Sequence, residues 1–202
     1  MSNNNSRNYA KMQASTTDYI NSLHNTYSKL LAVRVDFGYS KEHGQIAQLA
    51  DIKKDVKRML DNRRGNAIFR HQIGYVFKFE DAPDKGPHVH ALMLFDGQNV
   101  QKDAHRGDQL GDYWNKTITN GKGVYENCNR DKGKYSDCGI GMIDHSDVVK
   151  RNNLLNSVLP YMLKSEQSID GICKSGKEKS ITKGIAPKAK NGIGRPRSKK
   201  AE

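Results

Sequence analysis

The sequence predicts an α+β fold built on an antiparallel sheet of the ferredoxin-like, split βαβ type. Apolar residues alternate with polar ones in three separate stretches, which is the pattern of strands with one buried face. Elsewhere apolar residues recur at spacings of three and four, which predicts amphipathic helices. The resulting order of elements is β-α-β-β-α-β-α, and this order is typical of the split βαβ sheet.

The first predicted strand and helix lie in residues 30–62. The strand covers residues 30–37, and its two faces alternate between Leu31, Val33, Val35 and Phe37 on one side and Ala32, Arg34 and Asp36 on the other. An amphipathic helix is expected over residues 45–62.

A pair of adjacent strands follows, over residues 73–80 and 88–95. Between them, residues 81–87 contain two prolines and a glycine, which favours a loop. The first strand of the pair carries Tyr75, Phe77 and Phe79 on one face and Val76, Lys78 and Glu80 on the other.

The second half of the chain is less regular. A helix is predicted around Leu110 and Trp114, and residues 121–133 are expected to form a long loop or a loose hairpin. Residues 135–144 are expected to contain a final strand, and residues 148–167 a helix. Proline 160 lies inside this last helix and should kink it, because proline removes an internal hydrogen bond.

Size and composition suit one domain with polar extensions. We predict a polar N-terminal lead-in over residues 1–24 with a possible short helix, an enzymatic domain over 25–170 and a tail over 171–202. No apolar run is long enough to span a bilayer, and the N-terminus lacks the apolar region of a secretory signal. The protein is therefore expected in the cytoplasm, without a membrane partner. Three cysteines match neither a zinc site nor a disulfide framework.

The net charge of +12 is concentrated in the tail. Residues 171–202 hold 10 Lys or Arg and 2 acidic residues, few of their neighbours are apolar, and such a segment is expected to be disordered. The alternatives are a solubilising tail and a nucleic-acid-binding arm that contacts phosphates. In the second case the binding residues are Lys174, Lys177, Lys179, Arg195 and Arg197.

Two histidines on the third strand predict a metal site. His88 and His90 are two residues apart, so they share one face and can converge on one cation. If the second and third strands form a simple hairpin, Glu80 faces His88 across the ladder. Asp81 and Asp84 are alternative carboxylate ligands. Such a mixed nitrogen and oxygen site suits Mn²⁺ or Mg²⁺ in phosphodiester chemistry, although imidazole also suits Zn²⁺.

A nucleophile is predicted on the last helix. Tyr161 and Lys164 are three residues apart and share a helical face, so they can meet one phosphate. The phenolate would attack phosphorus while the ammonium holds a non-bridging oxygen. A tyrosine in an amphipathic helix is more often a core residue, and the interpretation therefore depends on the histidines.

The order of these motifs resembles that of the HUH endonucleases. These replication initiators combine His-hydrophobic-His on a strand with a later helical Tyr-x-x-Lys. More narrowly, two segments look like the replication proteins of the inovirus gene-two-like family: residues 86–92, GPHVHAL, and residues 159–167, LPYMLKSEQ. The resemblance covers roughly residues 28–168.

The resemblance implies a fold and a set of roles. It implies an antiparallel sheet of about five strands with the metal site on its face and the tyrosine helix packed across it. His88 and His90 match the histidine pair, Tyr161 the nucleophile and Lys164 its basic partner. Glu80 matches the acidic ligand of some initiators.

The implied activity is nicking of single-stranded DNA at a replication origin. Tyr161 would become joined to the 5′ end, and the free 3′ hydroxyl would prime rolling-circle replication of a phage, prophage or plasmid-like element. No complete Gly-x-x-x-x-Gly-Lys-Ser/Thr nucleotide-binding motif is present, so a host helicase and polymerase would be needed, in the cytoplasm of a bacterial or phage-infected cell.

Three other functions compete with this one. A single-tyrosine transposase would use the same chemistry. A non-catalytic nucleic-acid-binding module would stack bases on Tyr75, Phe77 and Phe79, if that face of the sheet is open. A metal-dependent nuclease that activates water would cleave without a covalent intermediate.

Overall fold

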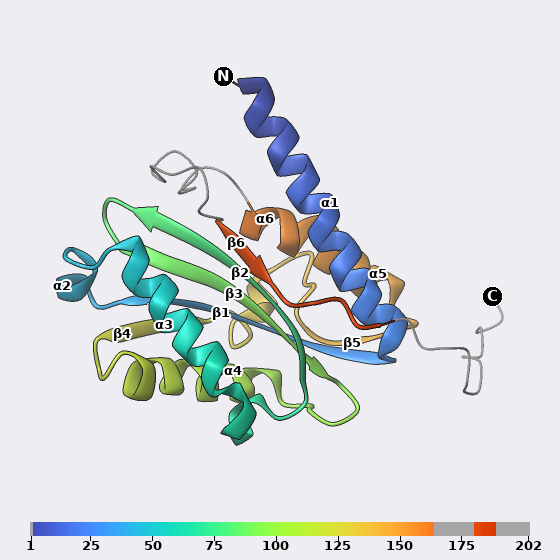
Figure 1. The fold of residues 1–202 in the computed structure, drawn as a ribbon. Helices are drawn as coiled ribbons and strands as arrows, with labels where there is room; N and C mark the ends of the chain where they lie inside the picture. The colour runs from blue at the N-terminus through green and yellow to red at the C-terminus, as the bar shows by residue number, and fades with distance from the viewer. Residues whose placement is uncertain (1, 164–179, 189–202) are drawn as a thin grey trace.

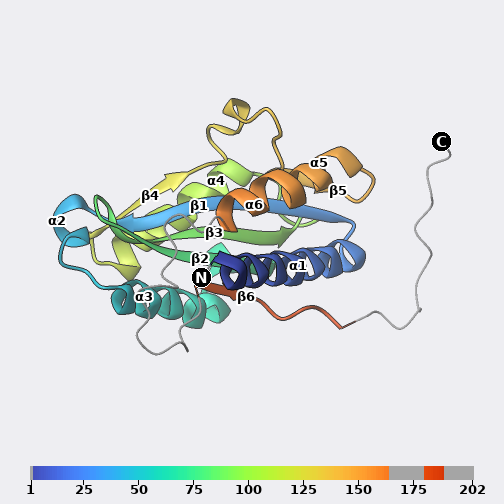
Figure 2. The ribbon, with the colours of Figure 1, turned by 90° about the horizontal axis from the view of Figure 1, so that it is seen from above.

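A computed structural model describes residues 2–163 and 180–188, with side chains from residue 7 onward (Figure 1). The described chain is α+β and has three layers, an antiparallel sheet with helices on both faces (Figures 1 and 2). The strands are β1 Lys29–Tyr39, β2 Gln72–Ala82, β3 Gly86–Asp96, β4 Gly123–Asn127, β5 Gly141–Asp144 and β6 Ile181–Lys183. The helices are α1 Ser2–Thr26, α2 Lys41–Gly44, α3 Leu49–Asp61, α4 Asp103–Tyr113, α5 Val148–Asn153 and α6 Leu159–Leu163.

The strand order supports the predicted topology. The sheet runs β4-β1-β3-β2-β6, and β5 pairs with the same edge of β1 as β4 does. β1 and β2 both run antiparallel to β3, which lies between them. The connection from β1 through α3 to β2 is therefore a split βαβ unit. The sheet has six strands within the described residues, where about five were expected.

The β2–β3 hairpin has the predicted register but a tighter turn. Glu80 lies opposite His88, as expected for a simple hairpin. The predicted loop over residues 81–87 is wrong in length, because the ladder continues to the pair of Ala82 and Gly86. Gly86 has φ +69°, a conformation that glycine adopts without strain, and this lets the chain turn within three residues.

Each face of the sheet buries its own apolar core. On one face the side chains of β1, β2 and β3 pack under α3 and α4, and this core includes Val33, Phe77, Met93, Ile52 and Trp114. On the other face they pack under α1 and α6, and this core includes Ala32, Val76, Leu92, Leu23 and Met162. Phe77 and Phe79 belong to the first core and are 0% and 3% exposed, so helices cover the aromatic face of β2.

The N-terminal segment is more ordered than a polar lead-in. α1 spans 25 residues, not the short helix expected. Its polar composition conceals a narrow apolar stripe, in which Tyr19, Ile20 and Leu23 are buried against the sheet. None of the described helices has the length and apolarity needed to cross a membrane.

Two short strands were not assigned from the sequence. β4 lies within residues 121–133, where a long loop or a loose hairpin was expected, and pairs with residues 35–39 of β1. β6 lies within the predicted disordered tail and pairs with Val76, Phe77 and Lys78 of β2. Disorder is therefore wrong for Ile181–Lys183, because the open edge of β2 offers backbone groups for pairing. The other tail residues named above all lie outside the described residues.

The final helix is interrupted just before Pro160. A π-helical turn, Leu154–Val158, joins α5 to α6, and the N–H of Leu159 donates to the carbonyl of Leu154. Pro160 has no N–H to donate to the preceding turn, which explains why the predicted irregularity occurs here. Tyr161 follows directly on α6.

Candidate metal centre and tyrosine cavity

One face of the sheet changes from apolar to charged along its strands. This is the face that packs under α1 and α6. Near one end its residues are Leu30, Ala32, Val76, Leu92 and Leu94. Toward the other end the same strand positions carry Arg34, Asp36, Lys78, Glu80, His88 and His90. Such charged groups are costly to bury unless they are paired, so their clustering makes this part of the sheet the candidate functional site.

Three of these side chains form a potential metal-binding group. Glu80, His88 and His90 each offer a ligand atom, and these atoms all lie within 4.8 Å of one another. The Nε2 atoms of His88 and His90 lie 3.4 Å and 3.3 Å from Glu80 Oε2. The cross-strand pairing of β2 and β3 produces this convergence, because Glu80 stands opposite His88.

The outer nitrogens of both imidazoles are already engaged. His88 Nδ1 lies 3.0 Å from the carbonyl oxygen of Gly86, which can only accept, so Nδ1 donates. His90 Nδ1 lies 2.9 Å from Asp36 Oδ2. Metal-binding histidines usually donate their second N–H as His88 does, which leaves the Nε2 lone pair for a cation. The contact of His90 Nδ1 with Asp36 is an ion pair and not a hydrogen bond. The residues therefore fit a divalent metal with two nitrogen ligands and one carboxylate.

Without a metal, the same groups hold each other by charge. Burial would raise the pKa of Glu80, but the contacts with His88 and His90 outweigh it and lower the pKa to about 2. Burial would lower the pKa of His90, but the contacts with Asp36 and Glu80 raise it to about 9. A cation that binds at His90 must therefore displace a proton.

Asp36 links the metal-binding group to Tyr161 through Arg34. The Nη2 atom of Arg34 lies 3.3 Å from Asp36 Oδ2. The Arg34 guanidinium also lies over the Tyr161 ring, 5.0 Å from its centroid. Arg34 is 6% exposed and Tyr161 is 56% exposed. Burial would lower the pKa of Arg34, but Asp36 raises it, so the guanidinium stays charged beside the phenol.

A cavity of about 700 Å³ joins these groups. Tyr161 lines it together with Asp36, Glu80, His88 and His90, and its wall also carries two lysines and two further carboxylates, Lys41, Lys85, Asp84 and Glu126. A cavity with a cation site, basic side chains and an accessible phenol is suited to a phosphate group and to attack on it.

The three candidate carboxylate ligands, Glu80, Asp81 and Asp84, occupy different places in the structure. Asp84 lines the same cavity from the turn of the hairpin. Asp81 is next to Glu80 on β2, so strand alternation directs it to the opposite face of the sheet. Glu80 is the carboxylate that belongs to the metal-binding group.

The sequence analysis did not identify three charged residues on this face of the sheet. Six of the residues that it did predict lie outside the part of the chain that the structure describes. Arg34 and Asp36 were read as one polar face of a strand, and the signal was their spacing of two on an otherwise buried strand. Lys78, 1% exposed on the same face of β2, was also missed. Lys164 and the tail residues Lys174, Lys177, Lys179, Arg195 and Arg197 lie outside the described residues.

Comparisons with known proteins identify a family for this chain. The model of the family described as the YagK/YfjJ C-terminal domain matches residues 1–126. No curated protein and no solved structure matches the chain. The matched stretch contains Glu80, His88 and His90 and ends before Tyr161. Because the match covers more than half of the 202 residues, the chain belongs to the YagK/YfjJ C-terminal domain family.

Proposed function

We propose that this protein is an HUH-type endonuclease that nicks and rejoins single-stranded DNA, with Tyr161 as the nucleophile and a divalent metal at Glu80, His88 and His90. One observation carries the proposal. A metal-binding group with both imidazoles oriented and an exposed tyrosine line the same cavity. The metal-binding group and Tyr161 lie far apart in the sequence, and their meeting in one cavity supports a shared chemical role.

The donor set favours Mn²⁺ or Mg²⁺ over a structural zinc. Two imidazoles and one carboxylate leave coordination positions for phosphate oxygens, whereas structural zinc sites are closed by four protein ligands. When bound, the metal would act as a Lewis acid that polarises the scissile phosphate.

The chain's own residues would supply the rest of the reaction. Tyr161 Oη forms a bond to phosphorus, the bond from phosphorus to the 3′ oxygen breaks, and the phenolic proton ends, in net terms, on the released 3′ hydroxyl. The Arg34 guanidinium places positive charge beside the ring, where negative charge develops as the phenol ionises. The 5′ end remains on the tyrosine until a 3′ hydroxyl attacks it and rejoins the strand.

Within this chemistry, we favour initiation of rolling-circle replication over transposition. The resemblance to the inovirus gene-two-like family supports it, and a single-tyrosine transposase would use the same residues. An initiator of this kind would act on an origin in the bacterial or phage-infected cytoplasm, with a host helicase and polymerase.

A covalent-adduct assay tests the proposal. The protein is mixed with end-labelled single-stranded oligonucleotides from its genomic neighbourhood, with Mn²⁺ or with EDTA, and resolved on a denaturing gel. We expect a slowly migrating protein–DNA band that needs Mn²⁺ and is lost in Tyr161→Phe. Tyr125→Phe is the matched control, since Tyr125 lines the same cavity and should keep the band.

Other results would point to the competing functions. Cleavage that persists in Tyr161→Phe without an adduct would indicate a nuclease that activates water. Binding without cleavage on oligonucleotides that span the origin would indicate a binding module. That module would need a different surface from the aromatic face of β2, because Phe77 and Phe79 are buried.

A further inference from the structure

A second cavity, of about 310 Å³, meets the first at Tyr161. Its lining includes Arg34, Lys134, Tyr135, Asp137, Ser157 and Tyr161. Tyr161 is thus a wall of both cavities. Glu80, His88 and His90 do not line this second cavity, so metal binding does not account for it.

Arg34 gives the second cavity a built anion-binding group. Its side chain is more than nine-tenths buried, and Nη2 reaches Asp36. The buried Nε, however, has no hydrogen-bond partner among the described residues. A buried donor without a partner is costly, and guanidinium donors match phosphate oxygens in geometry and charge. Arg34 lines the cavity, and its positive charge together with this unpartnered donor therefore indicates an anionic ligand.

Tyr135 gives the cavity an aromatic surface. It is 40% exposed although it is a large ring, and it is adjacent in the chain to Lys134, which also lines the cavity. An aromatic ring next to basic side chains is the combination on which single-stranded nucleic acids stack their bases and hold their phosphates.

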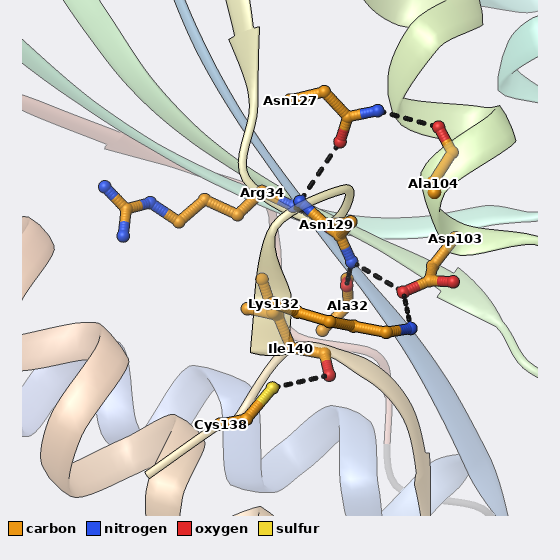
Figure 3. A network of polar contacts seen from close by, with 9 residues as sticks. All are labelled: Ala32, Arg34, Asp103, Ala104, Asn127, Asn129, Lys132, Cys138 and Ile140. Carbon is orange, nitrogen blue, oxygen red and sulfur yellow. Dashed lines mark hydrogen bonds and ion pairs between the residues drawn. The ribbon is translucent and has the colours of Figure 1, made fainter. Parts of the chain in front are cut away.

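The loop that carries Tyr135 is fixed in place by Asn129. This residue is 1% exposed and lies where the edge of β1 passes from β5 to β4. Its Oδ1 accepts the Arg34 N–H at 2.7 Å, and its Nδ2 donates to the Ala32 carbonyl and to Asp103 Oδ2, each at 3.0 Å (Figure 3). The side-chain amide thus takes the place of a strand peptide in the ladder.

A lysine completes this anchor. Lys132 Nζ lies 2.7 Å from Asp103 Oδ2, so the loop is tied to α4 as well as to β1 (Figure 3). The side chain of Arg34 extends away from this network. The wall and the floor of the cavity are therefore pre-organised, which lowers the entropic cost of binding.

We propose that the second cavity binds the nucleotide adjoining the phosphate that Tyr161 attacks, with Arg34 on a backbone phosphate and Tyr135 stacked on the base. The position of this nucleotide relative to the nick rests on the proposed function, whereas the affinity of the cavity for single-stranded DNA does not. The proposed ligand is thus a nucleotide of single-stranded DNA, and its binding does not require cleavage.

The test separates binding from cleavage. All variants are made in a Tyr161→Phe background, and binding of a fluorescein-labelled (dT)20 oligonucleotide is measured by anisotropy. Tyr135→Ala should weaken binding about 5- to 150-fold, the range of one lost base stack, whereas Tyr135→Phe should retain it within about twofold. Lys134→Ala should weaken binding more than Lys57→Ala. These lysines are 73% and 75% exposed and each pairs with an aspartate of its own segment, but Lys57 is on α3, on the other face of the sheet.

Photo-crosslinking locates the nucleotide. The same oligonucleotide with one 5-iodouracil is irradiated, and crosslinked peptides are identified by mass spectrometry; a crosslink at Tyr135 supports the proposal. Unchanged binding in Tyr135→Ala with crosslinks elsewhere overturns it, even if wild-type protein forms the Tyr161 adduct. Conversely, weakened binding and a Tyr135 crosslink without any adduct would keep the nucleotide cavity and overturn the nicking activity.

Discussion

Asp36 has two partners, and each serves a different part of the site. One oxygen contacts His90 Nδ1 at 2.9 Å and Arg34 Nη2 at 3.3 Å, so it holds a metal-binding imidazole and a guanidinium beside Tyr161 at once. Burial would raise the pKa of Asp36, but His90 and Arg34 lower it. The carboxylate therefore stays ionised and keeps the orientation of both neighbours.

The charge state of His90 predicts opposite effects of pH with and without metal. In EDTA the folded protein binds this proton more tightly than the unfolded chain, because the pKa is raised from 6.5 to about 9. Below pH 6.5 this proton adds up to about 3 kcal/mol to the free energy of unfolding. The contribution is lost as the pH rises from 6.5 through 9. Mn²⁺ displaces the same proton, so its stabilising effect should grow over that range.

Urea unfolding at pH 6.5, 7.5 and 8.5 checks this, with EDTA and with Mn²⁺. His90→Gln should remove the decline in EDTA and most of the Mn²⁺ effect. His105→Gln changes an exposed histidine on α4 and should alter neither. Stabilisation by Mn²⁺ that does not depend on pH would contradict a metal bound at His90.

Among the secondary elements, the long alternating strands were predictable and the short edge strands were not. β1, β2 and β3 are buried on both faces over most of their length. One face of each stays apolar while the other becomes charged toward one end, so each strand combines an apolar run with a stretch of alternation, and both patterns indicate a strand. β4 and β6 have five and three residues. Their pairing depends on a free edge supplied by distant residues, and no local pattern carries that information.

The β2–β3 hairpin couples backbone conformation to the metal centre, and Gly86→Ala tests this. The φ of +69° is strained for alanine, about 1–3 kcal/mol, and the added Cβ would lie 2.1 Å from the Gly44 carbonyl oxygen. Unfolding in urea should show a loss of at least that size. Because the Gly86 carbonyl holds His88 Nδ1, affinity for Mn²⁺ should also fall, about 10- to 100-fold.

Gly65→Ala is the control for this substitution. No atom lies within 4 Å of the added Cβ there, and its φ is not positive. Its effect should stay within about 0.5 kcal/mol, with no change in Mn²⁺ affinity. If Gly86→Ala destabilises the protein yet binds Mn²⁺ normally, the carbonyl of Gly86 does not orient His88.

For the whole molecule, the site combines residues of β1, β2 and β3, and only part of this arrangement could be predicted from the sequence. Glu80 and His88 come from neighbouring strands of one hairpin, so their register could be predicted from the chain alone. Asp36 reaches His90 because β1 lies on the far side of β3, and Arg34 reaches Tyr161 because α6 crosses that face. These contacts depend on tertiary packing, and sequence spacing does not encode them.

The basic segment beyond the last described residue predicts a salt effect. Residues 189–202 contain five Lys or Arg. If they contact phosphates, their deletion should reduce the slope of log affinity for single-stranded DNA against log salt by up to about 3.5. The deletion starts after Lys188 so that β6 is retained. Anisotropy titrations at several salt concentrations measure the slope, nicking should continue, and equal slopes with and without the segment would contradict a phosphate-binding arm.

The pairing of β6 with β2 has a consequence for the order in which the protein can fold as it is synthesised. Residues 76–78 leave the ribosome about a hundred residues before their partners at 181–183. At 5–20 residues per second, that delay is roughly 5–20 s. Throughout it, the edge of β2 has unpaired backbone groups that can recruit another strand. Nascent chains released before residue 181 should therefore aggregate more readily than full-length ones. Pairing with β6 protects the edge of β2 from other strands only when synthesis is nearly finished.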